Sequence, residues 1–399
     1  MNAVQHRGSI SGMFRPVPSS VLACLVIFVL TAAAIQSAQA QTLTILYSFT
    51  GGADGGQPYA KLVQDAAGNL YGTTPVGGAS NFGTVFKVDK TGKEAVLYSF
   101  GGGADGANPW TGLTWGPENH LYGTTEAGGT AGFGTIFKIS KGGKKTVLYN
   151  FTGAAGDGAY PFSRLIWDGV GHLYGTTYKG GASGNGTVFR LAKSGKETVL
   201  YSFQGGADGG NPYAGVVRDP VGNIYGTTFG IFGVDYGTVF KLNTGRKEKV
   251  LHAFTGGSDG GYPYYGSLVR DGAGNFYGTT SFGGANQYFG TVFKVNKAGQ
   301  QTVLYSFTGQ SDGGQPNASV IRDTAGNLYG TTIGGGASGH GTIFKLDASG
   351  KETVLYSFAG GTDAAAPDAD LLRDAAGNLY GTTIAGGASG AGTVFKLTP

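Results

Sequence analysis

The stretch GNLYGTTPVGGASNFGTVFKV, residues 68–88, holds two short apolar runs on either side of a glycine-rich linker. Near copies of it occur seven times, and the tetrad Tyr-Gly-Thr-Thr recurs every 51 or 52 residues (71 to 122, then 122 to 174). The seven tetrads begin at Tyr71, Tyr122, Tyr174, Tyr225, Tyr277, Tyr329 and Tyr380. A constant period of this length is the sequence signature of a repeat architecture, in which one supersecondary unit is stacked many times.

Each copy contains four predicted strands. In the first copy they cover residues 60–65, 69–74, 83–89 and 94–100, and we name them strands a to d. Apolar and β-branched residues fill these runs, and Gly, Asp, Asn and Pro bound them, which is the pattern of strands joined by tight turns. In the a to b turn, DAAGN, an Asp caps the turn and Gly or Asn supplies positive φ. The unit is therefore predicted to be a four-stranded antiparallel sheet.

Seven such sheets predict a β-propeller, because propellers arrange four-stranded sheets radially around a channel. The ends of the repeat array favour a closed ring. A lone strand d, residues 43–49, precedes the first copy, and the chain stops at Pro399 just after the seventh strand c. If the N-terminal strand completes the seventh blade, it pairs with the edge of strand c that would otherwise be exposed at the junction. We therefore expect an all-β, seven-bladed β-propeller over residues 41–399, closed by its N-terminal strand.

The first forty residues have the features of a secretory signal peptide. Arg7 and Arg15 form a basic start, an apolar run covers residues 21–34, and Ala38 and Ala40 provide an Ala-x-Ala cleavage site. We expect cleavage after Ala40 and a secreted or periplasmic mature protein, without a later membrane-spanning segment. Without the two arginines the 28 basic residues become 26, against 24 Asp and Glu. This balance gives no electrostatic basis for binding nucleic acid, and we expect a monomer.

The unit D-x-x-G-N-L-Y-G-T-T, followed by G-G-A-S-x-x-G-T-V-F-K, L-Y-S-F and D-G-x-x-P, resembles the Gloeo/Verruco (GloVer) tandem repeat of secreted and surface bacterial proteins. The resemblance covers nearly all of residues 43–399. It implies an extracytoplasmic, propeller-like protein, often tethered by a C-terminal sorting segment. This chain instead ends GTVFKLTP, with neither an apolar helix nor a basic tail. The D-x-x-G-N-L-Y part is also similar to blades of streptogramin-lyase, NHL and lactonase propellers, as a turn of the scaffold.

Comparison of the seven copies separates scaffold from candidate site. A residue that is identical in every blade has the same surroundings seven times, which indicates a role in packing. We therefore expect the tetrad glycine to let neighbouring sheets approach, and Tyr and Phe to fill the space between blades. The residues around the proline that opens strand a vary, and this segment lies at the channel mouth of a propeller. Aromatic rings interleaved with amides there suit a carbohydrate, although the same side chains would also plug the channel. The candidate ligand-binding residues are Gln57, Tyr59, Asn108, Trp110, Phe162, Asn211, Tyr213, Tyr264, Asn317 and Asp368.

These residues predict an extracytoplasmic binding module that recognises a carbohydrate or another polar surface ligand on the face formed by the d to a connections. Several weak contacts around a rigid ring would add through multivalency. The b to c loops are expected on the same face. Two of them depart from the repeat, residues 229–238 (FGIFGVDYGT) and 281–291 (SFGGANQYFGT), and departures of this kind are where a specific contact would be built.

One Asp recurs in every d to a connection, four residues before the proline. A carboxylate with nearby backbone carbonyls is the start of a Ca²⁺ site, but the ion needs about six to eight oxygens and each loop offers one carboxylate. The interpretation without a metal is a turn whose Asp caps its own backbone, and apart from the calcium alternative we expect no cofactor. The seven candidates are Asp54, Asp105, Asp157, Asp208, Asp259, Asp312 and Asp363.

Two alternatives to a binding module stay open. One is a propeller-type metal-dependent lyase or lactonase, and the other is a purely structural protein of the cell surface or matrix. The sequence shows no Ser-His-Asp or Cys-His constellation, and Asp368 with Asp370 is the local carboxylate pair suited to acid–base work. At the far end of strand a, four arginines suggest either an anion site or pairing with the adjacent turn aspartates. They are Arg218, Arg270, Arg322 and Arg373.

Overall fold

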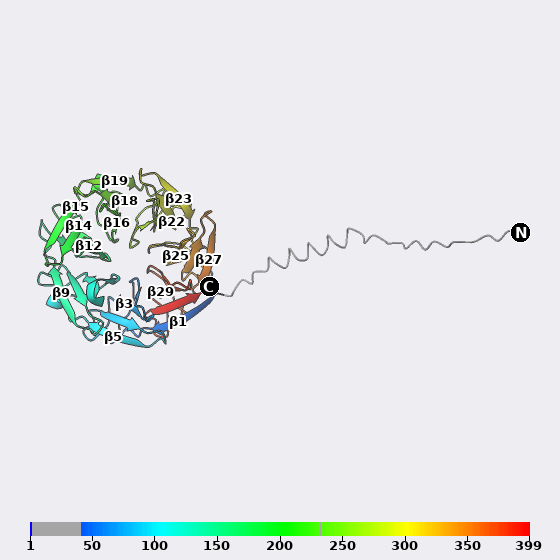
Figure 1. Ribbon diagram of the computed structural model, residues 1–399, viewed down its shortest axis with the longest axis horizontal. Helices are drawn as coiled ribbons and strands as arrows, with labels where there is room; N and C mark the ends of the chain where they lie inside the picture. Colours follow the sequence, from blue (N-terminus) through cyan, green and yellow to red (C-terminus); the bar gives the residue numbers. More distant parts are fainter. Residues whose placement is uncertain (2–40, 232) are drawn as a thin grey trace. The chain divides into compact units, whose positions relative to one another are not determined.

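The computed structural model describes Met1 and residues 41–231 and 233–399, so the predicted signal peptide lies outside the described residues. Residues Gln41–Pro399 form one unit of seven four-stranded antiparallel sheets. Figure 1 shows these sheets following one another around a central axis as the blades of a propeller. The predicted all-β, seven-bladed β-propeller is therefore confirmed. In the described part of the chain, no helix has the length and apolar character needed to cross a membrane.

Each blade has a short inner strand followed by three longer ones. Blades 1 and 2 are β2 (Val63–Gln64), β3 (Leu70–Thr74), β4 (Thr84–Val88) and β5 (Glu94–Ser99), then β6 (Thr114–Trp115), β7 (Leu121–Thr125), β8 (Thr135–Ile139) and β9 (Lys145–Asn150). Blades 3 and 4 are β11 (Ile166–Trp167), β12 (His172–Thr177), β14 (Thr187–Ala192) and β15 (Glu197–Ser202), then β16 (Val217–Arg218), β17 (Ile224–Thr228), β18 (Thr238–Leu242) and β19 (Glu248–Ala253). Blades 5 and 6 are β20 (Val269–Arg270), β21 (Phe276–Thr280), β22 (Thr291–Val295) and β23 (Gln301–Ser306), then β24 (Ile321–Arg322), β25 (Leu328–Thr332), β26 (Thr342–Leu346) and β27 (Glu352–Ser357). Outside these ladders, β10 (Gly158–Ala159) of a d to a connection pairs with β13 (Lys179–Gly180) of a b to c loop. The 3₁₀ turns η1 (Gly103–Asp105) and η3 (Gly206–Asp208) lie in d to a connections, and η2 (Pro117–Asn119) joins β6 to β7 within blade 2.

Blade 7 is built from both ends of the propeller sequence. Its strands lie in the order β1 (Thr42–Ser48), β30 (Thr393–Thr398), β29 (Leu379–Thr383) and β28 (Leu372–Arg373). The antiparallel register runs from Thr42 opposite Thr398 to Ser48 opposite Thr393, and Figure 1 shows β1 along the red strand that ends at the C-terminus. The predicted closure by the N-terminal strand is confirmed, and β1 covers the edge that β30 would otherwise present.

The inner strand is shorter than the sequence predicts. The pattern predicts strand a over residues 60–65, whereas only Val63–Gln64 pairs with β3. The preceding residues are held by the neighbouring blade instead, because the first Thr of six of the seven tetrads bonds a carbonyl oxygen of the next blade. Thr73 Oγ1 donates to the carbonyl oxygen of Thr111 at 2.9 Å, and Thr382 Oγ1 to that of Ala60 at 3.5 Å, which joins blade 7 to blade 1. These segments therefore leave their own ladders and line the channel.

The rest of the tetrad is also scaffold. Tyr71 Oη donates to the turn residue Asp65 at 2.9 Å, and Thr74 Oγ1 lies 2.8 Å from Thr84 Oγ1 across the β3–β4 pair. The tetrad glycine has a different role from the predicted one. A Cβ at Gly72 would lie 2.5 Å from a ring carbon of Phe86, the residue paired with it in β4. The glycine therefore makes room for a ring of its own blade rather than for a neighbouring sheet.

Phenylalanines fill the space between blades, as predicted. The Phe that follows strand d of one blade meets the strand-c Phe of the next blade edge to face, as Phe100 meets Phe137 with ring centroids 5.3 Å apart. Phe49, which follows β1, makes the same contact with Phe86 of blade 1 at 5.0 Å. All four rings are fully buried. The hydrophobic core thus continues around the ring and through the closing strand.

Candidate functional site

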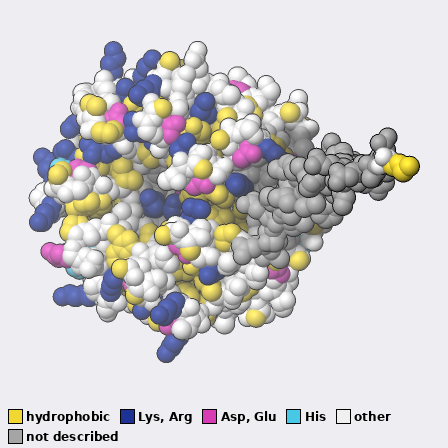
Figure 2. Space-filling view, turned by 45° about the vertical axis from the view of Figure 1, so that its right-hand side comes forward, with side chains coloured by type: hydrophobic (Ala, Val, Ile, Leu, Met, Phe, Trp, Pro, Cys, Tyr) yellow, Lys and Arg dark blue, Asp and Glu magenta, His cyan; other side chains and the backbone are white. Residues whose placement is uncertain are grey.

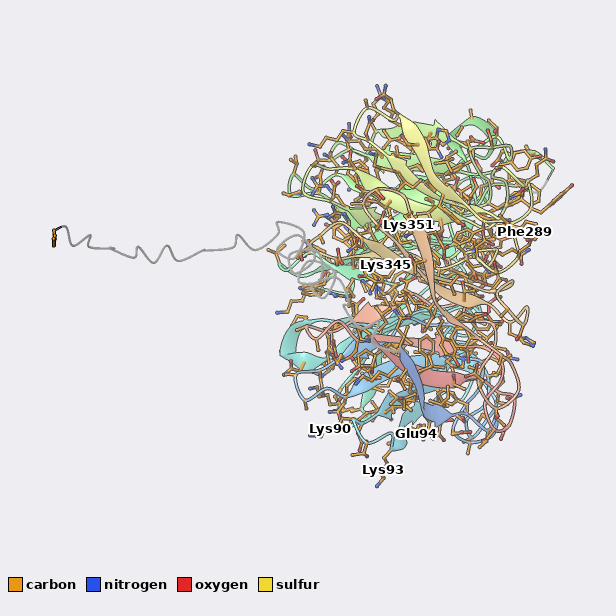
Figure 3. The ribbon with its side chains drawn as sticks, turned by 90° about the vertical axis from the view of Figure 1, so that its right-hand side faces the viewer. Lys90, Lys93, Glu94, Phe289, Lys345 and Lys351 are labelled. Atoms are coloured by element: carbon orange, nitrogen blue, oxygen red, sulfur yellow. The ribbon has the colours of Figure 1, made fainter. Side chains whose placement is uncertain are left out.

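The d to a connections and the b to c loops lie on one face, as predicted, and they are hydrogen-bonded to each other. In blade 1, Gly56 N donates to Val76 O at 3.1 Å, and Gln57 N donates to Ala391 O in the b to c loop of blade 7 at 2.7 Å. Figure 3 views the propeller from its edge, with Phe289 of a b to c loop toward one face and Lys90 of a c to d turn toward the other. One face therefore carries both sets of loops.

The residue before each proline has a left-handed backbone. Its φ lies between 53° and 57° in every blade, at Gln57, Asn108, Tyr160, Asn211, Tyr262, Gln315 and Ala366. Its N–H donates to the b to c loop of the preceding blade, as Tyr262 N does to Tyr236 O at 2.8 Å. A non-glycine residue in this conformation costs on the order of 1 kcal/mol, and Asn accepts it most readily. Part of the amide pattern at these positions therefore has a backbone cause.

The aromatic residues that follow the prolines form a cluster of rings over the channel. Tyr59 contacts Trp110 with centroids 4.8 Å apart, and Tyr213 contacts Tyr264 at 5.0 Å. Blade 5 has an extra residue, Tyr265, whose ring lies 6.4 Å from Tyr59 of blade 1. Blades 1 and 5 are not neighbours, so this contact crosses the axis. These rings pack on one another over the channel mouth, and part of the cluster also borders a groove.

The groove has a volume of about 800 Å³ and lies over blades 3 to 6. Its walls are the b to c loops of blades 3, 4 and 5 and the d to a connections that lead into blades 4, 5 and 6. Two of these loops, residues 229–238 and 281–291, are the ones that depart from the repeat. We call this feature the aromatic groove, and its lining residues are Tyr178, Lys179, Asn211, Tyr213, Phe229, Gly230, Ile231, Tyr236, Tyr262, Tyr264, Ser281, Phe282, Gln315 and Asn317.

The rings of the groove support one another. Tyr236 is 37% exposed and its ring plane lies within 8° of that of Phe282, with centroids 6.5 Å apart. Phe229 packs on Tyr262 at 5.0 Å. Tyr213 stacks on Tyr178 at 4.4 Å. Burial and a hydrogen bond with Tyr178 raise the pKa of Tyr213 above its ordinary value, so its hydroxyl stays neutral and can donate. The result is a rigid aromatic wall with one edge open to solvent.

A lysine and three amides add polar groups to this wall. Lys179 Nζ donates to Asn211 Oδ1 at 3.1 Å and lies 4.6 Å from the centre of the Tyr178 ring. Asn211 Nδ2 donates in turn to Gly230 O at 3.0 Å. Lys179 is the single charged residue among the described residues that line the groove, and none of them is acidic. The groove therefore combines ring faces, amides and one ammonium group.

The structure divides the ten predicted ligand-binding residues into three groups. Asn211, Tyr213, Tyr264 and Asn317 line the aromatic groove. Tyr59, Trp110, Phe162 and Asp368 line a separate cavity of about 50 Å³ beneath the ring cluster. Gln57 is exposed, and Asn108 donates from its side chain to Pro75 O at 2.9 Å, so neither lines the groove. The other ten groove residues were not among the predicted ligand contacts, although the two irregular loops indicated where several of them lie.

Asp368 and Asp370 border the same channel cavity. Asp368 is 4% exposed, and its Oδ1 has no hydrogen-bond partner among the described residues. Burial raises the pKa of Asp368 to about 7, against the opposing effect of Asn317. Asp370 Oδ1 accepts the backbone N–H of Ser319 at 2.7 Å. The two carboxyl groups thus have different surroundings and different proton affinities, below the ring cluster rather than in the groove.

The recurring Asp of the d to a connections caps its own loop. Asp54 accepts from Thr50 N at 2.8 Å and from Tyr47 Oη at 2.9 Å, and Asp312 accepts from the equivalent groups at 2.8 and 3.0 Å. Burial raises the pKa of Asp54, but these hydrogen bonds outweigh it and hold the pKa below its ordinary value. The described residues contain no group of three or more His, Cys, Asp or Glu side chains arranged to hold a metal ion. Calcium binding at the seven loops stays a prediction.

Three of the four arginines at the far end of the inner strands, Arg218, Arg322 and Arg373, lie over a tyrosine of the preceding blade. The Arg218 guanidinium is 4.6 Å from the centre of the Tyr174 ring and 3.9 Å from Asp168 Oδ2. The adjacent turn residue Asp219 instead accepts from Asn223 Nδ2 at 2.7 Å. The ion pair of Arg218 is therefore with Asp168 of the preceding blade and not with Asp219 of the turn that follows it in the sequence.

Known proteins share this architecture. Among solved structures, the extracellular domain of a "putative hybrid two component system" from B. thetaiotaomicron is 11% identical, with a TM-score of 0.57 over 89% of this chain and 39% of that chain. The extracellular domain of a "putative one component system" from the same organism is 12% identical, with a TM-score of 0.50 over 84% and 37%. The chain thus spans less than half the length of either. Identities this low show the fold alone, and no curated protein matches significantly.

The repeat itself identifies the family. The family model described as the Gloeobacter/Verrucomicrobia repeat matches residues 26–233, 91–273 and 216–399. These segments overlap and together cover every blade described above. The chain therefore belongs to the Gloeobacter/Verrucomicrobia repeat family.

Proposed function

We propose that the protein is an extracytoplasmic binding module whose aromatic groove takes a saccharide or a similarly polar ligand. The composition of the groove carries the proposal, since seven of its fourteen lining residues are aromatic and three carry amides. Its volume of about 800 Å³ lies within the range of roughly 300–1,000 Å³ that is usual for small-molecule sites. Ring faces can stack on the C–H faces of a sugar, and amides can bond its hydroxyls.

One polar residue of the groove, Lys179, is not required by the scaffold. Lys179 occupies a position where the six other copies have Val76, Ala127, Gly230, Phe282, Gly334 and Ala385. Six blades form without a charge there, so packing gives no reason for the lysine. Asn211 and the Tyr178 ring hold its ammonium group in place. That group still has hydrogens to donate to a hydroxyl or carboxylate of a ligand.

The extracytoplasmic location is part of the proposal. It rests on the signal-peptide pattern of residues 1–40, and two structures that share the fold are extracellular domains. A ligand outside the cytoplasm is either dissolved or held on a surface. A preformed groove can bind such a ligand without coupling to an energy source.

The test is a binding screen of residues 41–399 against neutral and acidic bacterial polysaccharides, with two matched variants. Tyr236 and Phe82 occupy the same repeat position, in blades 4 and 1, and are 37% and 39% exposed. Tyr236→Ala removes a ring from the groove, and we expect it to weaken saccharide binding roughly tenfold, as loss of one aromatic contact does. Phe82→Ala should bind as the wild type does. An absence of saccharide binding by the wild type, or an equal loss in both variants, would contradict the proposal.

A further inference from the structure

The channel beneath the ring cluster contains charged side chains that the aromatic groove does not use. Two cavities, of about 50 and about 120 Å³, lie there and share four polar lining residues from blades 1, 3, 5 and 7. These are Lys61, Arg164, Ser267 and Asp370. Asp368 lines only the smaller cavity. Figure 2 shows Lys and Arg side chains beside hydrophobic ones near the centre of one face. The larger cavity therefore has two cationic groups and one carboxylate in its wall.

The single carboxylate of the larger cavity is already engaged. Asp370 Oδ1 accepts the N–H of Ser319 at 2.7 Å, and its Oδ2 lies 3.8 Å from Lys61 Nζ. Among the described residues Arg164 forms no ion pair within 4.0 Å, although Asp370 attracts it electrostatically. Burial lowers the pKa of both Lys61 and Arg164, and Asp370 offsets this effect only in part. Because a guanidinium stays protonated, Arg164 is a partly buried charge that shares the carboxylate of Asp370 with Lys61, so two cations face one engaged counter-ion in this cavity.

Two glycines let the cationic side chains cross the channel. A Cβ at Gly112 would lie 3.2 Å from Lys61 Cβ and 3.3 Å from Arg164 Cδ. A Cβ at Gly215 would lie 2.8 Å from Arg164 O and 2.9 Å from Ser267 Oγ. Any larger residue at either position would press on the groups that line the cavities. The small residues thus keep the space beside both cations open.

We propose that the channel holds one small oxyanion, a carboxylate, phosphate or sulfate, between Lys61 and Arg164, with the Ser267 hydroxyl as a third donor. Arginine and lysine form strong charge-assisted hydrogen bonds with such anions. A volume of about 120 Å³ is well above the roughly 10–15 Å³, measured in the same way, that one water needs. The bound anion would join blades 1, 3 and 5 across the axis, and it would stabilise the propeller because it binds only the folded chain. This site is independent of ligand binding in the aromatic groove.

The experiment measures thermal unfolding of residues 41–399 while phosphate, sulfate or acetate is titrated at constant ionic strength. We expect the wild-type Tm to rise by roughly 3–4 °C at a hundredfold excess of oxyanion over its Kd. Arg164→Gln should lose most of this rise. Lys193→Gln, which removes an exposed lysine from a turn of blade 3, should keep it. The three anions distinguish a carboxylate from a phosphate or sulfate ligand.

Two further measurements keep the outcome clear if Arg164→Gln does not fold. Lys61→Gln should also reduce the oxyanion-dependent rise, whereas Lys61→Arg should retain it. Equilibrium dialysis of the wild type with labelled phosphate should give one site per chain, with competition by sulfate. The inference would be overturned by an unchanged wild-type Tm together with no bound phosphate. Equal rises in the wild type, Arg164→Gln and Lys61→Gln would overturn it as well, since they would reflect a general salt effect.

Discussion

The many glycines of the chain serve at least two distinct purposes at the level of single residues. Gly128, in a b to c loop, has a φ of +76° that side-chain-bearing residues seldom adopt. Gly123, within β7, has no such conformation, and its reason is packing, because a Cβ there would lie 2.7 Å from Phe137 Cζ and 3.0 Å from Leu113 Cδ2. Both neighbours are fully buried. A methyl group at residue 123 would therefore have to displace the core of blade 2.

We expect Gly123→Ala to lower the free energy of unfolding by about 1–3 kcal/mol, the usual cost of overpacking a core. Gly272→Ala is the control, since a Cβ there would meet nothing within 4 Å and its φ is not in the left-handed region. Chemical denaturation of residues 41–399 measures both. If Gly123→Ala proves as stable as Gly272→Ala, the tetrad glycine has no packing role within its blade.

Single residues also explain why only part of the candidate site was predicted. Comparison of the copies located the variable positions around the prolines, and four of the ten predicted residues do line the groove. It could not show that Tyr265, one inserted residue, contacts Tyr59 across the axis, which depends on the folded positions of blades 1 and 5. The insertion also coincides with the loss of one bond between blades. Thr227, the first Thr of the preceding blade's tetrad, has a buried Oγ1 without a partner among the described residues. Contacts of this kind depend on where the blades lie relative to one another in the folded chain, and the repeat pattern does not contain that information.

The strand-d elements carry an electrostatic feature that links neighbouring blades. Four of them begin with a glutamate whose Oε1 is buried without a hydrogen-bond partner among the described residues: Glu94, Glu197, Glu248 and Glu352. Burial, with a smaller effect of the d to a aspartate of the preceding blade, raises the pKa of Glu197 to about 8 and that of the other three to about 7. In blade 2 the equivalent residue is Lys145, which forms an ion pair with Asp105 at 2.9 Å. The same position thus holds a like-charge pair in four blades and an opposite-charge pair in one.

These glutamates predict that stability falls as the pH rises from about 5 to about 8. Their folded-state pKa values lie above the unfolded value of about 4.3, so in this window the native chain binds more protons than the unfolded chain. The contribution of these glutamates to the free energy of unfolding is complete below the unfolded-state pKa. It is lost as the pH rises through the folded-state pKa. Glu197→Gln should therefore raise the Tm at pH 8 by a few degrees and change it little at pH 5. Gln301 already occupies this position in blade 5 and donates to Asp259 O at 3.1 Å, so an amide fits there.

Thermal unfolding between pH 4 and pH 9 measures the effect, with Glu118→Gln as the control because that side chain is 79% exposed. A Tm profile of Glu197→Gln that runs parallel to the wild-type profile would rule out the glutamate pairs as its cause. At the acid end a different group dominates. Burial raises the pKa of Asp168, but hydrogen bonds from His172 and Val170 outweigh it and lower the pKa to about 2, so its contribution is lost only as the pH falls toward that value.

At the scale of the whole molecule, the fold was predictable because its repeat, its turns and its chain ends all favour the same closed ring. The number of blades follows from counting tetrads, and the closing strand follows from the unmatched strand d at residues 43–49. The length of strand a was not predictable from its apolar pattern. Residues 60–62 have that pattern, yet Thr382 bonds Ala60 from blade 7, and this contact exists only in the closed ring.

Closure gives the ring one junction that can open without unfolding a blade. Strand β1 is joined to the rest of blade 7 only through its pairing with β30, whereas strand d of every other blade follows its strand c through a turn. Phe49 then fixes the junction to blade 1 through its contact with Phe86. The equivalent contact inside the chain is that of Phe203 with Phe240, at 5.2 Å and with the same complete burial.

We expect Phe49→Ala and Phe203→Ala to destabilise the propeller by similar amounts, about 3–5 kcal/mol, because each leaves a cavity of the same kind in the core. They should differ in where the structure opens. In Phe49→Ala the amides of β1 and β30 should exchange with solvent well before the rest, since separating β1 requires no other blade to unfold. In Phe203→Ala the strand next to the cavity is held at both ends by the chain, so β1 and β30 should keep their protection until global unfolding. Hydrogen exchange resolved by segment distinguishes the two outcomes. If protection of β1 is unchanged in Phe49→Ala, or falls equally in both variants, then the junction in blade 7 is no weaker than the covalent connections of the other six blades.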